Sequence, residues 1–165
     1  MNPRADFGLS ILSSLLSCIV VAALFAWPRL RTASSERALT WLVAPHMFLR
    51  FIGLSFLVSG VVSESLPKAW AVPAGYGDFV AGILAIIATV ALAKASTWAI
   101  AAVWAFNIWG AADLLFAFYK GASVALEPGS LGAGFYLVTA VVPPLLVSHA
   151  LIFGQLIRTG SFNGR

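Results

Sequence analysis

The chain has 165 residues, of which 61% are hydrophobic and only 10% are charged. Soluble domains carry about 25% charged residues, so this composition excludes an ordinary soluble domain and predicts an integral membrane protein rich in aromatic anchors. The net charge of +4 comes from ten Lys and Arg residues scattered between apolar segments, without the patch that nucleic-acid binding requires.

The first apolar segment covers residues 7–27 and contains no charged side chain. It is too long for the apolar region of a cleaved signal peptide, which has about 7 to 15 residues. We therefore expect a retained transmembrane helix that ends at Pro28. The segment also contains the only cysteine, Cys18, which excludes a disulfide framework or a thiol-rich metal site.

Four further segments are apolar enough to cross a bilayer, which takes about 20 residues of helix. They cover residues 41–62, 78–93, 98–119 and 135–157. The connections between them are short and rich in turn-forming residues, so a separate soluble domain is excluded. The sequence predicts a single all-α domain, a polytopic bundle of five transmembrane helices.

Basic residues in short loops indicate how such a bundle is oriented. Three lie in the N-terminus and in the second and fourth loops, and six lie in the first and third loops and the C-terminus. We therefore predict a multi-pass protein of the inner (plasma) membrane, with its N-terminus outside and its C-terminus in the cytoplasm. The residues assigned to the cytoplasm are Arg29, Arg31, Arg37, Lys94, Arg158 and Arg165.

Small residues and prolines predict two features of helix packing. Small side chains allow helices to approach closely in lipid, and they gather in the third and fourth segments, which we expect to pack together. Pro143 and Pro144 predict a kink in the fifth segment, because proline removes a backbone donor and clashes with the preceding turn. The small residues are Ala81, Gly82, Ala85, Ala88, Gly110 and Ala111.

Ionisable and amide side chains inside the predicted helices are the candidate functional residues. A charge at the centre of a membrane helix costs at least about 2.5 to 3.5 kcal/mol, so such residues need a partner or a function. Counted at 1.5 Å per residue, four of the five lie about 8 to 14 Å from the cytoplasmic end and Asp113 about 22 Å. The five residues expected to form a polar interior are His46, Arg50, Asn107, Asp113 and His149.

Two of these residues are expected to pair across helices. His46 and Arg50 are four residues apart and share one helix face. The long Arg50 side chain reaches toward Asp113, which permits an ion pair between the second and fourth helices. Such an ion pair could also serve only to hold the helices together. Asn107 could likewise serve only to form a hydrogen bond between helices. His46, close to Trp41, has an interfacial interpretation.

Asp78 follows the glycines of "PAGYGDF", residues 73–79, at the outer edge of the third segment. An Asp in the first turn of a helix accepts hydrogen bonds from free backbone amides and faces the positive end of the dipole. We therefore interpret Asp78 as a helix cap. A place in the lining of an outer vestibule stays open as an alternative.

Two histidines at similar depth are the minimum for a bis-histidine b-type haem, with His46 and His149 as axial ligands. A zinc or di-iron centre needs more ligands than the sequence places together. No Ser, His and acid arrangement predicts nucleophilic catalysis. The sequence therefore predicts neither an enzyme nor a required cofactor, and a haem-binding enzyme or electron-transfer protein that uses the two histidines stays open as the alternative.

Two motifs resemble a group of small uncharacterised bacterial multi-span membrane proteins. Residues 71–88 contain a PAGxGD pattern carried by Pro73, Gly75, Gly77 and Asp78. Residues 104–121 are similar to a W-N-x-x-G-x-x-D-L pattern carried by Trp104, Asn107, Gly110, Asp113 and Leu114. The resemblance covers about a third of the chain and implies no activity. It implies that Asp78 and Asp113 belong to one arrangement at the outer ends of adjacent helices.

The functional hypothesis from the sequence is a bundle whose polar interior binds or passes a small ligand or a proton. A haem or other redox protein is the second hypothesis, and a structural or accessory subunit of a membrane complex is the third. The expected partner is the lipid bilayer rather than nucleic acid. A homo-oligomer or an unknown membrane partner remains open.

Overall fold

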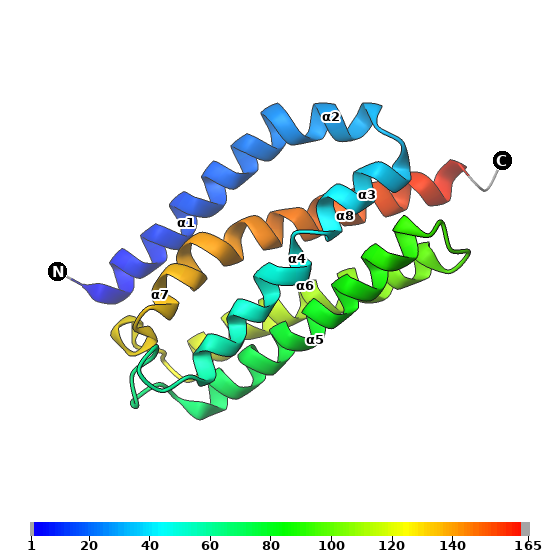
Figure 1. Cartoon of the computed structure of the whole chain (residues 1–165). Helices are drawn as coiled ribbons and strands as arrows, with labels where there is room; N and C mark the ends of the chain where they lie inside the picture. The colour runs from blue at the N-terminus through cyan, green and yellow to red at the C-terminus, as the bar shows by residue number, and fades with distance from the viewer. Residues whose placement is uncertain (1, 163–165) are drawn as a thin grey trace.

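The structure is a computed structural model that describes residues 2–162, with side chains up to Thr159. Arg165, counted above toward a cytoplasmic C-terminus, lies outside the described residues. The part of the chain that is described is helical, without β-strands (Figure 1). In chain order the elements are α1 (Pro3–Val21), η1 (Ala22–Ala26), α2 (Trp27–Thr32), α3 (Ser35–Val43), α4 (His46–Leu49), η2 (Arg50–Leu57), α5 (Lys68–Ala93), α6 (Ala99–Ser123), η3 (Pro128–Leu131), α7 (Gly134–Tyr136), η4 (Leu137–Val141) and α8 (Val142–Phe162).

Five helical stretches are long and apolar enough to cross a membrane, as the sequence predicted. The first continues past Pro28, because the π-helical turn η1 precedes the proline and α2 carries the helix on to Thr32. The second begins with Ser34 as its cap rather than at residue 41. The five stretches are Pro3–Thr32, Ser35–Leu57, Lys68–Ala93, Ala99–Ser123 and Gly134–Thr159.

The third helix differs most from its prediction. α5 begins at Lys68 rather than at residue 78 and contains Pro73 as its sixth residue. Proline is tolerated there because only one hydrogen bond, to the carbonyl of Ala69, is lost near the helix start. The interpretation of Asp78 as a cap is therefore wrong, since this residue lies in the helix interior.

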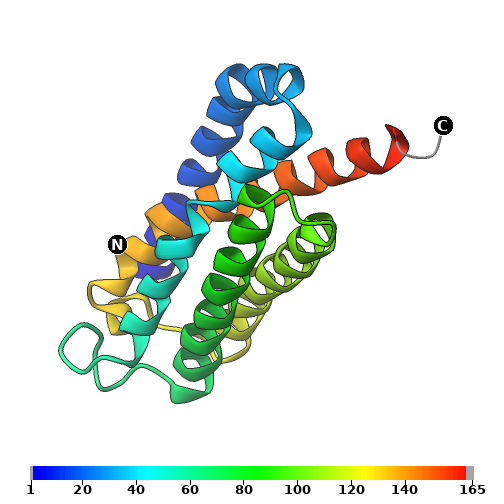
Figure 2. The ribbon, with the colours of Figure 1, turned by 45° about the vertical axis from the view of Figure 1, so that its right-hand side comes forward.

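α5 and α6 pack against each other more extensively than any other pair of described elements. Ala81, Ala85 and Ala88 are fully buried, or nearly so, along α5, which confirms the predicted close packing of the third and fourth helices. Gly82 has a different neighbour, because its open side faces the ring of Phe51 in η2. The α3–α4–η2 segment lies beside α5, and α8 lies beside α3 and α6 (Figures 1 and 2).

The first helix lies at the edge of the bundle, where α1 packs mainly on α8 and η4 (Figure 1). The start of α1 and the far end of α8 lie at opposite ends of the molecule (Figure 1). In the fifth stretch the π-helical turn η4 precedes Pro143 and Pro144, which occupy the first turn of α8. π-helical turns are sites where helices bend, and this one stands where the sequence predicted a kink.

Two apolar cores divide the interior along its length. One contains Leu39, Ala88 and Val103, toward the loop between α5 and α6. The other contains Trp70 and Leu131, toward the N-terminal end of α1. On α5, α6 and α8, Asp78, Asn107 and His149 fall between the segments that supply these two cores. The polar interior is therefore a layer near the middle of the bundle.

Candidate functional site

Arg50 is the centre of the polar layer, and its side chain is fully buried. Nη1 donates to Asp78 Oδ1 at 2.5 Å and to Asp113 Oδ2 at 3.1 Å. Nη2 donates to the carbonyl oxygen of Gly110 at 2.6 Å and bonds to His149 Nε2 at 2.8 Å. The predicted pair of Arg50 and Asp113 is confirmed, and Asp78 is a second, closer carboxylate partner.

His149 connects Arg50 to Asn107. Because a guanidinium can only donate, His149 Nε2 accepts and the imidazole carries its proton on Nδ1. Nδ1 then donates to Asn107 Oδ1 at 2.6 Å, and Asn107 Nδ2 donates to the backbone oxygen of His149 at 3.2 Å. This arrangement fixes one neutral tautomer of His149 and one orientation of the amide.

His46 lies on the other side of the His149 ring. It is fully buried, with its ring centroid 4.6 Å from that of His149 and 5.0 Å from that of Phe106. Its Nε2 bonds to Ser148 Oγ at 2.6 Å, and Nδ1 has no hydrogen-bond partner among the described residues. The interfacial interpretation of His46 is wrong, because the second helix begins at Ser35 and brings the residue to mid-bundle.

Three glycines make room for the charged side chains. A Cβ on Gly53 would collide with the Asp78 carboxylate, and one on Gly77 would collide with the Asp113 carboxylate. A Cβ on Gly110 would lie 2.6 Å from the His149 ring and 2.9 Å from Arg50 Nη2. η2, α5 and α6 therefore each present bare backbone to the cluster.

Asp78 and Asp113 share this cluster but do not lie at helix ends. Each lies ten residues inside its helix, counted from Lys68 in α5 and from Ser123 in α6, which is about 15 Å at 1.5 Å per residue. The two carboxylates do form one arrangement, as the resemblance implied, but it lies inside the two helices rather than at their outer ends. Two carboxylates face one guanidinium, so the formal charge of the three side chains is −1.

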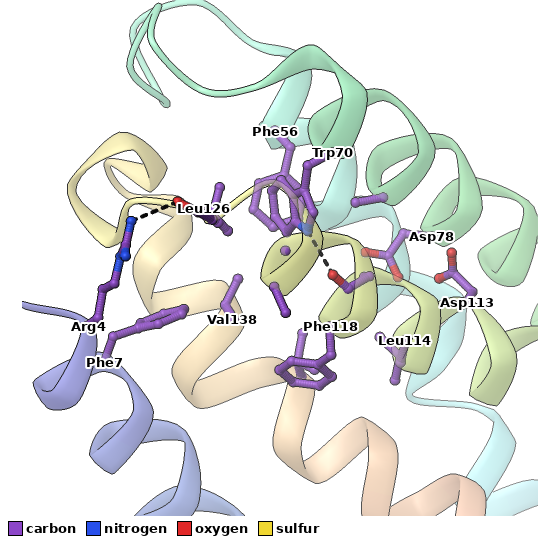
Figure 3. Close-up of a pocket in the computed structure, with 16 residues that line it drawn as sticks. Arg4, Phe7, Phe56, Trp70, Asp78, Asp113, Leu114, Phe118, Leu126 and Val138 are labelled. Atoms are coloured by element: carbon purple, nitrogen blue, oxygen red, sulfur yellow. Dashed lines mark hydrogen bonds between the residues drawn. The ribbon is translucent and has the colours of Figure 1, made fainter.

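A cavity of about 340 Å³ leads to the two carboxylates (Figure 3). Asp78 and Asp113 lie at one end of it and Arg4, from the start of α1, lies at the other (Figure 3). Both carboxylate side chains keep 9% exposure, whereas the guanidinium behind them has none. The remaining lining is Phe7, Phe56, Trp70, Ala74, Leu114, Ala117, Phe118, Gly121, Ala122, Ala125, Leu126, Val138 and Val142.

Helical spacing explains how α5 and α6 form the walls. Trp70, Ala74 and Asp78 follow one another at four-residue intervals and so share a face of α5. On α6 the lining residues recur at helical intervals from Leu114 to Ala122. Trp70 Nε1 donates to the carbonyl oxygen of Ala117 at 2.9 Å, which holds the indole against α6 (Figure 3).

The structure brings all six residues singled out from the sequence into one connected layer. Five of them are buried, and Asp113 is only partly so. The sequence interpretation missed the cavity walls, above all Trp70 and Ala117. The four-residue spacing of Trp70, Ala74 and Asp78 would have indicated that wall if the helix had been traced through Pro73.

The two histidines do not fit a bis-histidine haem in this arrangement. Axial ligands lie on opposite faces of a porphyrin, but the rings of His46 and His149 are in contact. Both nitrogens of His149 are already hydrogen-bonded. Among the described residues there is also no group of three or more His, Cys, Asp or Glu that could hold a metal ion.

Comparison with known proteins places the chain in one family. A family model described as a domain of unknown function, DUF8737, matches residues 6–157. No curated protein and no solved structure matches the chain. Since the match spans nearly all of the sequence, the chain belongs to the DUF8737 family.

Proposed function

We propose that this chain is an integral membrane protein that binds a small ligand in the cavity ending at Asp78 and Asp113. Its five long apolar helices and the large apolar side chains on its outer surface support a bilayer setting. The basic residues of the loops support an outside N-terminus. In that orientation the Arg4 end of the cavity opens toward the outer side of the plasma membrane.

One observation carries this proposal: the cavity extends from the end of the bundle to a buried charge cluster. An ion pair that only holds helices together needs no cavity beside it. Protein interiors are closely packed and rarely keep voids of this size, so the cavity calls for another explanation. Small-molecule sites have volumes of roughly 300 to 1,000 Å³, mostly apolar walls and a few convergent polar groups. The cavity, with apolar walls and two carboxylates at one end, matches that description.

The cluster also contributes to packing, since it joins the second, third, fourth and fifth helices through Arg50, Asp78, Asn107 and His149. A structural subunit would need this network, but it would not need the space beside it. Permeation would require a path beyond the cluster. There the apolar core with Leu39 and Val103 follows directly, so binding is better supported than transport.

Cysteine labelling tests whether the cavity admits a small molecule. In a Cys18→Ser background, Ala74→Cys places a thiol on the cavity wall one turn from Asp78. Ala85→Cys, on the same helix but fully buried in the core away from the cavity, is the matched control. We expect methyl methanethiosulfonate, which is small and uncharged, to modify the thiol at position 74 of the folded protein and to leave that at position 85 unmodified.

The same experiment contains the outcome that overturns the proposal. If the thiol at position 74 reacts only when the protein is unfolded, as at position 85, the cavity is closed and the structural interpretation replaces ligand binding. Thermal unfolding of both variants checks that the labelling difference arises in the native state.

A further inference from the structure

We propose that the ligand of this cavity is a small organic cation, a protonated amine carried on an apolar body. This inference rests on the proposed function and names the chemical class of the ligand. It follows from the charge at the inner end of the cavity, from the unused oxygens of the two carboxylates, and from the aromatic walls.

The inner end of the cavity presents negative charge. Asp78 and Asp113 line the cavity, whereas Arg50 does not and is fully buried behind them. One guanidinium cannot neutralise two ionised carboxylates, so the cluster lacks one positive charge. In a low-dielectric interior an uncompensated charge is costly, and a bound monocation would complete the balance.

The carboxylates also retain hydrogen-bonding capacity. Arg50 Nη1 uses Oδ1 of Asp78 and Oδ2 of Asp113. Asp78 Oδ2 and Asp113 Oδ1 accept no hydrogen bond from any described residue. Asp113 is held at the longer distance, 3.1 Å, and the two side chains are equally exposed, at 9%. An ammonium group, which has donors and no acceptors, matches these free oxygens, with Asp113 as its main partner.

The walls suit an apolar cation rather than a hydrated ion. The rings of Phe7, Phe56, Trp70 and Phe118 line the cavity, and aromatic faces attract ammonium groups. Phe56 and Trp70 pack edge to face, with centroids 4.8 Å apart. Arg4 at the mouth forms an ion pair with Glu127, so its charge is already compensated. A hard metal ion would need about six oxygen ligands, more than this site presents.

The probes are 2-phenylethylamine, a cation at neutral pH, and 2-phenylethanol, a neutral molecule of the same shape. We measure how each slows the reaction of methyl methanethiosulfonate with the thiol of Ala74→Cys, and derive a Kd from the concentration dependence. We expect the amine to bind about tenfold more tightly than the alcohol or better, because a charged hydrogen bond is lost with the alcohol.

Asp113→Asn keeps the shape of the side chain and removes the unbalanced charge. We expect this variant to bind amine and alcohol with similar affinity. Asp6→Asn is the matched control, since Asp6 lies in the first turn of α1 outside the cavity lining, and it should keep the preference for the amine.

Charge-selective labelling tests the inference without altering the cluster. The thiol at position 74 should react faster with 2-aminoethyl methanethiosulfonate than with its sulfonate analogue, after correction for their rates with a free thiol. Equal rates for the two reagents, equal affinities for the two probes, or an amine preference that survives in Asp113→Asn would overturn the ligand class. The proposed function would still stand if the uncharged reagent labels position 74, and would fall if it does not.

Discussion

At the scale of single residues, the two carboxylates differ in how firmly they are held. Asp78 Oδ1 lies 2.5 Å from Arg50 Nη1 and Asp113 Oδ2 lies 3.1 Å from it, although both side chains keep 9% exposure. Both approach the guanidinium only because Gly53 and Gly77 offer no side chain at the point of contact. Asp78 is thus the closer partner of Arg50, and Asp113 is the carboxylate that the proposed ligand would bind.

Gly53→Ala is predicted to destabilise the protein. The added methyl would occupy the position of the Asp78 carboxylate, so Asp78 must leave Arg50 and a buried charge loses its closer partner. Breaking a buried ion pair typically costs about 3 to 5 kcal/mol, and overpacking alone about 1 to 3 kcal/mol. Thermal unfolding of the detergent-solubilised protein should show a clear loss of stability.

Gly8→Ala is the control for this substitution, because nothing lies within 4 Å of its added methyl in α1. Its unfolding temperature should stay unchanged or rise slightly, since Ala is favoured over Gly in a helix by about 1 kcal/mol. Equal stability of the Gly53→Ala and Gly8→Ala variants would contradict the contact between Gly53 and Asp78.

The pair of Arg50 and Asp113 could be predicted from the sequence, while the second partner Asp78 could not. A charged residue in an apolar helix has few possible partners, and helix rise together with the length of the Arg50 side chain places it within reach of Asp113. Asp78 follows "PAGYG", which is typical of a turn and a helix start. Only tertiary packing, through the approach of η2 to α5 at Gly53, shows that the helix includes this segment.

At the scale of secondary structure elements, α5 is the helix on which the candidate site depends. It supplies Trp70, Ala74 and Asp78 to the cavity, and two of these precede the helix start that the sequence predicted. Pro73 is the reason for that error, since proline inside a helix removes a hydrogen bond and is disfavoured by about 3 kcal/mol relative to alanine. Here packing on α6 and η2 overrides the local preference.

Pro73→Ala is predicted to stabilise the protein, because the new backbone N–H can donate to the carbonyl oxygen of Ala69 four residues earlier in the helix. The gain should be about 1 kcal/mol or more, less than the full helix-interior penalty because the proline lies in the second turn. The measurement is thermal unfolding, with amide hydrogen exchange to show stronger protection at the start of α5. A lower stability would mean that the proline sets the helix geometry required by its neighbours.

At the scale of the whole molecule, the number and type of helices could be predicted because apolar length is a local property of the sequence. Five stretches were expected and five are present in the described residues. The cavity could not be predicted as a whole, because the space depends on small side chains, such as Ala74 on α5 and Ala117 and Gly121 on α6, that come together only in the bundle. A small residue in the sequence is compatible with a close helix contact and with a cavity wall. Only the assembled bundle shows which of these it forms.

The proposed orientation predicts the outcome of reporter fusions. Alkaline phosphatase, which is active only outside the cytoplasm, should be active when fused after Ser65, in the loop before α5. A fluorescent protein that folds in the cytoplasm should be bright when fused after Lys94, in the loop before α6. The opposite pattern at both positions would reverse the orientation and place the cavity mouth on the cytoplasmic side.

The central ion cluster has a consequence for how the protein is made. Its cation, Arg50, leaves the ribosome before either acid, and three successive helices each carry one charge that costs at least about 2.5 kcal/mol in lipid. In the proposed membrane setting Arg50 has no carboxylate partner until α5 has been made, so insertion of the second helix becomes more favourable once α5 brings Asp78 to it. The order of charges along the chain would then couple insertion of the second helix to assembly of the central layer.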